Sequence, residues 1–240
     1  MNIINDLISR VNCDAEVRDI RIGMFHTGVL TRDCGLAASL PRDVLKGTGP
    51  HITEPGFLME RQVKDLVGMA YSENILEAAV GMATLNSLLE IEEEKCLELN
   101  AGDLIEKKGE GRRIAIVGHF PFIPKLQKTA KELWVIEKNP KETDFPEEAA
   151  EKFIPMADIV GITGTAITNH SIDHLLGLCS SDAFVVVLGD STPLSNALFD
   201  HGIDAVSGVK VVNSELALKC VSQGGNFRQI KGIRKLTLMR

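Results

Sequence analysis

The 240-residue sequence has few aromatic side chains and no excess of basic ones. It contains one Trp and one Tyr, and its formal net charge is -7. A surface that binds nucleic acid needs Lys and Arg to neutralise phosphates and aromatic rings to stack on bases. The composition therefore argues against nucleic acid as a partner.

Paired cysteines and long apolar runs are also missing. The five cysteines are an odd number and include no C-x-x-C pair, which is typical of a reduced chain rather than of a disulfide framework. The longest apolar runs, such as residues 183–188, are much shorter than a membrane span, and the N-terminus has no apolar signal core. We therefore expect free thiols, a cytoplasmic location and no membrane partner.

Common catalytic and cofactor motifs are absent too. There is no Ser-His-Asp order and no H-E-x-x-H motif, so nothing specific favours a hydrolase. A diphosphate loop of the G-x-G-x-x-G kind is missing as well. The loop at residues 118–124, Gly-His-Phe-Pro-Phe-Ile-Pro, has one glycine and two prolines that lack an N-H donor. This argues against NAD as a cofactor.

The second half of the chain alternates short apolar runs with amphipathic stretches. Runs of four to six mainly apolar residues, closed by small or polar residues, are typical of strands buried on both faces of a parallel sheet. Five such strands are expected at residues 114–117, 133–136, 158–163, 183–188 and 203–206, with an edge strand at 235–239. Helices are expected between them, including 167–178 and 214–222. The pattern predicts an open α/β sheet covered by helices on both faces.

The first hundred residues predict a smaller α+β domain. An amphipathic helix is expected at residues 1–11, two or three antiparallel strands between 17 and 40, and helices at 60–71 and 72–90 with Ser72 as N-cap. The whole acidic excess lies in residues 1–100, and the charged, Gly-bounded stretch 102–111 is interpreted as a linker. We therefore expect domains at residues 1–100 and 112–240.

Candidate site residues follow the expected parallel strands. Ligands of such sheets bind outside the carboxyl ends of the strands, near the point where the strand order reverses. Small and polar residues lie at these ends: Gly118, His119, Glu137, Thr163, Gly164, Thr165, Gly189, Asp190, Ser191, Ser207 and Gly208. Thr163 to Thr165 open a helix with free N-H groups and form the best candidate for an anion site. Glu137 lies 19 residues after Gly118, near the place where an acidic side chain receives ribose hydroxyls.

Histidines give further hypotheses. His119 could bind a metal ion or transfer a proton, with Glu137 as its charge partner, or its ring could only cap the turn before Pro121. His170 and His174 have the i, i+4 spacing of a metal site, although the apolar residues of that helix centre on its opposite side.

Two stretches of the first half are candidates as well. Asn86 lies in the apolar stripe Ile75, Ala79, Met82 and Leu89, so its amide either ties down a neighbouring loop or holds a ligand in the cleft. The loop at 46–56 is either a surface connection or an anion-binding nest at Gly47 to Gly49 with His51 and Glu54 nearby.

With these motifs, the chain resembles the putative heavy-metal chelation family of bacterial and archaeal proteins. The likeness rests on residues 117–121, on Glu137 after 134–136, on 157–158 leading to 163–166 with Asn169, on 188–189 followed by 191–194, and on Ser72, Asn74 and 81–86. The resemblance implies a domain like the N-terminal domain of enolase, a Rossmann-like C-terminal domain and a site in the cleft between them. It adds Phe120 and Asn169 to the ligand-binding candidates. Asp190 stands where a proline is expected, and His170 where a glycine is expected.

Two classes of function follow. The first is a protein that binds metal or a metal-chelating metabolite, with His119, Glu137 and Asp190 as metal ligands and His51 and Glu54 nearby. The alternative is an enzyme or sensor for an adenosine-like or phosphate-bearing metabolite. A structural or interaction protein with a vestigial pocket is a third alternative. The expected partner is a small molecule or a divalent metal ion, a homodimer is allowed for, and no residue is assigned to catalysis.

Overall fold

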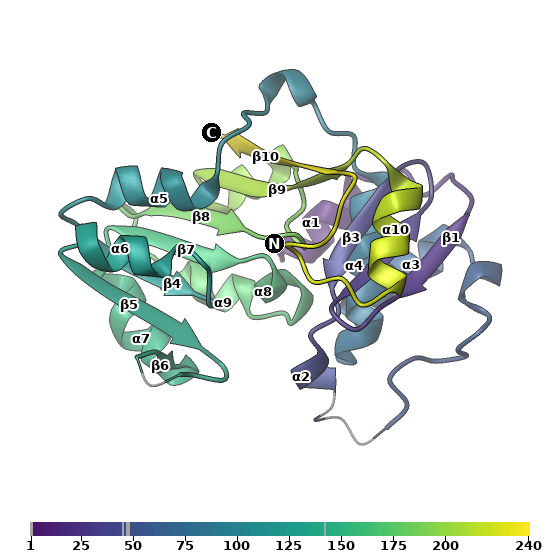
Figure 1. The fold of residues 1–240 in the computed structure, drawn as a ribbon, viewed down its shortest axis with the longest axis horizontal. Helices are drawn as coiled ribbons and strands as arrows, with labels where there is room; N and C mark the ends of the chain where they lie inside the picture. Colours follow the sequence, from purple (N-terminus) through teal and green to yellow (C-terminus); the bar gives the residue numbers. More distant parts are fainter. Residues whose placement is uncertain (1, 45, 47–48, 142) are drawn as a thin grey trace.

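Two β-sheets organise the computed structural model, which describes residues 2–44, 46, 49–141 and 143–240. One sheet has three antiparallel strands in the order β1-β2-β3. The other has seven strands in the order β10-β9-β8-β7-β4-β5-β6. Figure 1 shows the sheets side by side, with the seven-stranded sheet on the left and the small sheet on the right. The expected combination of a small α+β unit and a larger, mainly parallel α/β unit is confirmed.

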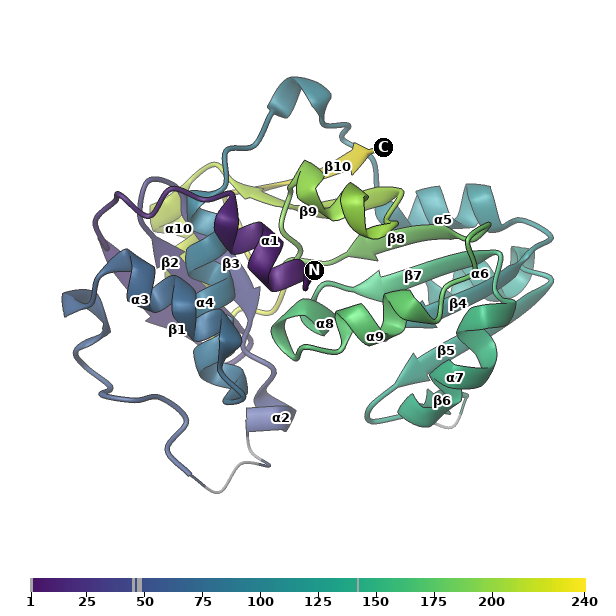
Figure 2. The same ribbon diagram turned by 180° about the vertical axis from the view of Figure 1, so that it is seen from behind.

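The small sheet is covered on both faces by helices. Its strands are β1 (Asp19–Ile22), β2 (His26–Leu30) and β3 (Cys34–Ala38). The helices α3 (Val63–Gly68) and α4 (Ile75–Leu88) lie on one face, and α10 (Ser214–Ser222), from the end of the chain, lies on the other (Figures 1 and 2). The C-terminal part of the chain thus completes the N-terminal unit, because α10 buries Ala217 and Val221 beside Leu36.

The N-cap of helix α4 lies two residues later than predicted. Asn74, and not Ser72, is the N-cap: its side-chain oxygen accepts a hydrogen bond from the Leu76 amide at 3.2 Å. Ser72 instead donates its hydroxyl to Glu77 at 2.8 Å. The expectation that this helix is buried nearly all round is confirmed, since every residue from Ala78 to Leu85 is buried.

The large sheet is parallel except for its last strand. Its strands are β4 (Arg113–Val117), β5 (Glu132–Glu137), β6 (Phe145–Pro146), β7 (Ile159–Thr163), β8 (Phe184–Leu188), β9 (Ala205–Val211) and the antiparallel β10 (Ile233–Met239). The chain passes from β4 to β5 on one side and from β7 to β8 and β9 on the other. The strand order therefore reverses between β4 and β7, which is where ligands bind in open sheets of this kind.

Alternate residues of the strands face different helical layers. Ile114 and Ile116 of β4 pack with α5 (Ala101–Gly109) and α6 (Ile123–Thr129), and Ala115 between them packs with the opposite layer. That opposite layer contains α7 (Ala150–Phe153), α8 (Thr165–Thr168), α9 (Ile172–Gly177) and the 3-10 helix η6 (Asn196–His201). Both faces of the sheet are thus buried, as the continuous apolar runs predict. Within the described ranges, no helix is long and apolar enough to cross a membrane.

Three sequence-based expectations are corrected here. The expected linker at 102–111 is mostly helix α5. The apolar residues of this stretch recur on one helical face, and Ile105 on that face is fully buried against the large sheet. The division into domains at this point stays a prediction. Strand β9 continues to Val211, so Ser207 and Gly208 lie inside a strand and not in a loop at its carboxyl end. The expected helix 167–178 is interrupted at Asn169 and His170, where His170 has a left-handed φ of 63°.

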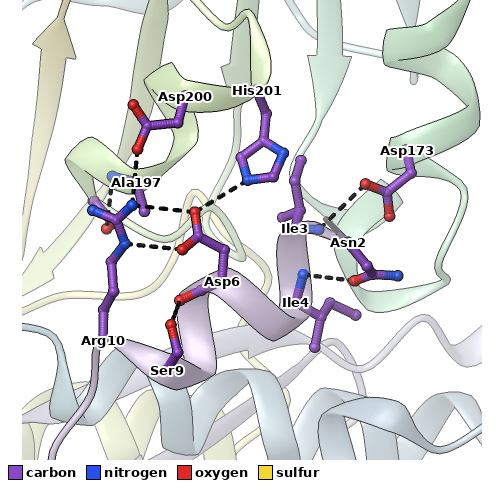
Figure 3. Close-up of polar contacts among 11 residues, drawn as sticks. Asn2, Ile3, Ile4, Asp6, Ser9, Arg10, Asp173, Ala197, Asp200 and His201 are labelled. Atoms are coloured by element: carbon purple, nitrogen blue, oxygen red, sulfur yellow. Dashed lines mark hydrogen bonds and ion pairs between the residues drawn. The ribbon is translucent and has the colours of Figure 1, made fainter.

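A polar network fastens the N-terminal helix α1 (Ile3–Ser9) to the large unit (Figure 3). Asp6 accepts hydrogen bonds from Arg10 Nε at 3.0 Å and from His201 Nε2 at 3.1 Å. Arg10 also contacts Asp200 at 2.8 Å, and the Ile3 amide donates to Asp173 at 3.2 Å. The Arg10 guanidinium is the main cause that lowers the pKa of Asp6, and His201 adds to it. The ionised form of Asp6 therefore stabilises the contact between the units.

We expect Asp6→Asn to lower the free energy of unfolding at pH 7 by about 1 to 3 kcal/mol, the range for hydrogen bonds to a charged group whose partners stay behind. The folded-state pKa of Asp6 lies below its ordinary value, so its stabilisation is present above about 3.8 and is lost as the pH falls through the folded-state pKa. Urea unfolding between pH 7 and pH 3 should show the difference from the wild type shrinking only at the acid end. Asp200→Asn is the control, because that carboxylate is 67% exposed and should contribute less than about 1 kcal/mol.

Gly35 lets strand β3 lie directly on helix α4. A Cβ atom at this position would clash with the Ala83 carbonyl oxygen and the Ser87 amide nitrogen, which are backbone atoms. We expect Gly35→Ala to destabilise the fold by about 1 to 3 kcal/mol or more in urea unfolding, as overpacking does. Gly177→Ala is the control, since nothing lies within 4 Å of the added methyl group and alanine favours the helix. Equal stabilities of the two variants would contradict this account of the packing.

Candidate functional site

The switch point of the large sheet opens into a cavity of about 430 Å³ between the two units. Its walls come from the loops after β4, β5 and β7 and from helices α7 to α9, together with Phe25, Leu40, Arg42 and Asp43 of the small unit. Seven of the predicted site residues line it: Gly118, His119, Phe120, Glu137, Thr163, Thr165 and Asn169. The structure thus brings together the candidates from three neighbouring strands.

The loop after β4 begins with a glycine in a conformation that other residues avoid. Gly118 has a φ of 107°, and a Cβ there would lie 3.1 Å from both the Phe120 ring and the Thr163 side chain. Its amide donates to the Ile136 carbonyl at 2.9 Å, so the turn stays attached to β5. This turn places His119 in the cavity wall.

His119 contacts a carboxylate that the sequence did not single out. Its Nδ1 lies 3.1 Å from Asp144 Oδ2, so the predicted pairing with Glu137 is wrong even though β4 and β5 are neighbours. The Asp144 side chain is only 1% exposed, and the same oxygen accepts the Lys141 amide at 3.1 Å. Asp144 lies in a stretch rich in Glu, Lys and Pro, where no pattern distinguishes one carboxylate from another.

Glu137 ends β5 on the same rim as His119. The register pairs Val117 of β4 with Ile136 of β5, so Glu137 and His119 both lie at the carboxyl ends of these adjacent strands. The next residue, Lys138, pairs with Glu147 at 3.6 Å, another residue of the cavity wall. Glu137 thus supplies a half-buried carboxylate close to the switch point.

The loop after β7 is held by its own side chains. The hydroxyl oxygens of Thr163 and Thr165 lie 3.0 Å apart, and the Asn169 side-chain oxygen accepts from both the amide and the hydroxyl of Ser171. Gly164 does not line the cavity: it packs on Thr192, and its amide donates to the Leu188 carbonyl at 2.8 Å. Thr163, Thr165 and Asn169 line the cavity from this strand end.

The remaining predicted residues lie at the junction of the two units and not in the cavity wall. Asp190 is paired with His26 of β2, whose ring is buried and whose Nδ1 also contacts the Gly225 carbonyl at 3.3 Å. The Ser191 hydroxyl accepts the Ala38 amide of β3 at 2.8 Å. With Gly189, which has a φ of 127°, these residues fasten the loop after β8 to the small sheet.

Asn86 belongs to the same junction. Its amide nitrogen donates to the Leu36 carbonyl at 2.9 Å and to the Ser191 carbonyl at 3.2 Å. With Asp190 it lines a separate cavity of about 20 Å³. Of the two alternatives for this residue, its contacts match the one in which the amide ties down a neighbouring loop.

A second cavity of about 400 Å³ adjoins the first and shares Asp43, Lys138 and Asn169 with it. His51 lines it, whereas Glu54 pairs with Arg61 at the surface. Gly47 and Thr48, two members of the hypothetical anion nest, lie outside the described residues. The cleft between the units thus extends from the switch point toward the start of α4.

The described residues do not assemble a metal site. No group of three His, Cys, Asp or Glu side chains among residues 2–44, 46, 49–141 and 143–240 could hold a metal ion. The structure therefore does not bring His119, Glu137 and Asp190 together as ligands. The i, i+4 pair is also divided, because His170 contacts the Ala70 carbonyl at 2.9 Å and His174 pairs with Glu151 at 3.0 Å.

Cys34 and Cys179 do not offer thiolates to a metal ion. All five cysteines are free, as expected. Burial raises the pKa of Cys34 to about 12, with Asp19 and Asp33 adding to the shift, and burial raises that of Cys179 to about 11. Both remain thiols at neutral pH, so neither is prepared to bind a soft metal ion.

We expect Asn86→Leu to lower the free energy of unfolding by about 1 to 3 kcal/mol in urea, because two carbonyl groups at the junction would lose their donor. Asn86→Asp should be similarly harmful, since it keeps the shape and removes the N-H groups. Asn5→Leu is the control, because its exposed side chain bonds only to Tyr71 within the described residues. If Asn86→Leu were as stable as the wild type, the amide would not be structural, and Asn86 would again be a candidate for binding a ligand.

Comparison with known proteins agrees with this architecture. A crystal structure of a protein of unknown function from Desulfitobacterium hafniense matches with a TM-score of 0.86 at 24% identity, over 99% of this chain and 98% of that one. A second, from Pyrococcus horikoshii, matches with a TM-score of 0.85 at 22% identity over 99% and 100%. An uncharacterized protein of Methanocaldococcus jannaschii is 22% identical over 96% of this chain and 92% of its own length. Two family models match, at residues 4–89 and 100–240, and both carry the description "Putative heavy-metal chelation". The chain therefore belongs to the family that carries this description.

Proposed function

We propose that the protein binds a small polar metabolite in the cavity at the switch point. The observation that carries this proposal is the convergence of His119, Glu137, Thr163 and Thr165 on one cavity of about 430 Å³ between the units. Clefts of this size with a few convergent polar groups are the usual form of small-molecule sites, and the reversal of strand order is their usual place.

The hydrogen-bonding character of the wall supports a ligand with hydroxyl groups. Glu137 is a carboxylate at the end of β5, in the position where such sheets receive ribose hydroxyls. The loop after β4 has Pro121 and Pro124 where a diphosphate cradle needs free N-H groups. A nucleoside-like metabolite therefore suits the site better than a dinucleotide.

A second candidate, supported by the family description, is a metal ion bound as cargo. The described residues lack a cluster of three ligands, so they do not fit a bare ion held by the protein alone. A metal already chelated by a metabolite would need only one or two protein ligands. His119 and Glu137 would supply them, because both line the same cavity.

Thermal-shift and calorimetric titrations separate these candidates. We expect nucleosides, or a metal ion mixed with a chelating metabolite, to raise the melting temperature, since a ligand at 100 times its dissociation constant stabilises a fold by about 2.7 kcal/mol. Divalent metal ions alone should give little shift. His119→Gln and Glu137→Gln should each abolish the response and leave the melting temperature of the free protein nearly unchanged.

Glu132→Gln is the matched control, because Glu132 is an exposed carboxylate at the other end of the same strand. It should bind like the wild type. Binding that survives both cavity substitutions would place the site elsewhere, and tight binding of a bare ion would favour direct chelation.

A further inference from the structure

The buried carboxylate behind His119 gives this histidine a defined orientation. Asp144 Oδ2 contacts His119 Nδ1 at 3.1 Å and the Lys141 amide at 3.1 Å. The Asp144 side chain is 1% exposed, while the His119 side chain is 33% exposed and lines the cavity. Asp144 thus holds the ring through Nδ1, and the exposed part of the side chain lies at the cavity.

The partner of Nδ1 determines which ring nitrogen carries the hydrogen. An ionised carboxylate only accepts hydrogen bonds, so Nδ1 must donate. In the neutral ring, Nε2 then has a free lone pair. Within the described part of the chain, Nε2 has no hydrogen-bonding partner, so this lone pair is available to a ligand.

Asp144 depends on the contact with His119 for its own hydrogen bonding. Its second oxygen, Oδ1, is buried and has no hydrogen-bonding partner among the described residues. Burying a carboxylate without satisfying both oxygens costs free energy. The hydrogen bonds that Oδ2 accepts from the His119 ring and the Lys141 amide offset part of this cost.

We infer that His119 accepts a hydrogen bond from a ligand hydroxyl at Nε2 and that Asp144 is its positioning residue. The inference rests on the proposed function, since it names the ligand group that the same cavity recognises. The hydroxyl keeps its O-H bond and donates to the lone pair of Nε2, while Nδ1-H donates to the Asp144 carboxylate.

Glu137 restricts the ligands that this histidine can bind. It lines the same cavity with a carboxylate, so a ligand that contacts both residues needs at least two polar hydrogens. The hydroxyl groups of a ribose or another polyol supply them. The site therefore favours a polyhydroxylated metabolite.

The tautomer of His119 can be measured on the ligand-free protein by NMR of the histidine ring nitrogens. At about pH 8 we expect His119 to carry its hydrogen on Nδ1, because Asp144 accepts it there. Asp144→Ala should shift the hydrogen toward Nε2, the form that a histidine side chain prefers in water. The His119→Gln variant identifies the resonances.

The surface pair His174 and Glu151 provides the matched control, because both side chains are more than 60% exposed. Glu151→Ala removes a carboxylate from a histidine in the same way but should leave the His119 signals unchanged. A wild-type His119 with its hydrogen on Nε2 would overturn the inference, even if the Asp144 variant failed to fold. An unchanged tautomer in a folded Asp144→Ala protein would overturn it as well.

Chemical modification tests whether Nε2 is reachable from the cavity. Diethyl pyrocarbonate acylates unprotonated imidazole nitrogens, and peptide mass spectrometry locates the product. We expect His119 to be modified at a rate close to that of exposed His174 and much faster than His26, whose two ring nitrogens both have partners. Protection of His119 equal to that of His26 would contradict the inference. Because these measurements use free protein, their failure is distinct from failure of the ligand screen.

Discussion

The cavity exists because the loop after β8 is clamped to the small unit. Asp190 pairs with the buried His26, Ser191 accepts the Ala38 amide, and Asn86 donates to the Ser191 carbonyl. Each contact joins a different element of the small unit, namely β2, β3 and α4, to one loop of the large unit. Three separate attachments fix both the distance and the orientation of the units, and hence the width of the cleft.

A shared apolar core reinforces this clamp. Side chains of α1 and α4 belong to the same buried cluster as those of β7, α9 and η6. The C-terminal segment adds a second connection, because β9 extends beyond its pairing with β8 to contact β3, and α10 covers the outer face of the small sheet. The two units therefore depend on each other for burial, and the chain crosses between them more than once.

The site uses the part of the large sheet that this arrangement leaves open. Reversal of strand order separates the loops after β4 and β7, and the small unit closes the opening with Phe25, Leu40, Arg42 and Asp43. The polar groups of the rim differ in their contacts. Asp190 pairs with His26 and has a structural role, whereas His119 contacts Asp144 through Nδ1 and remains partly exposed at the cavity.

Most strands of the large sheet, their mainly parallel arrangement and the rim that contains His119 and Glu137 could be predicted from the residues alone, because apolar periodicity and strand-end residues are local properties. The short strand β6 and the extension of β9 to Val211 could not. The sequence did not reveal that 102–111 is mainly a packed helix, since charged and glycine residues there conceal a narrow apolar face. The partners of His119, Asp190 and Asn86 became known only from how the sheets and helices pack. Those partners come from segments 25, 164 and 50 residues or more away, and no local pattern encodes which distant groups meet when the sheets pack.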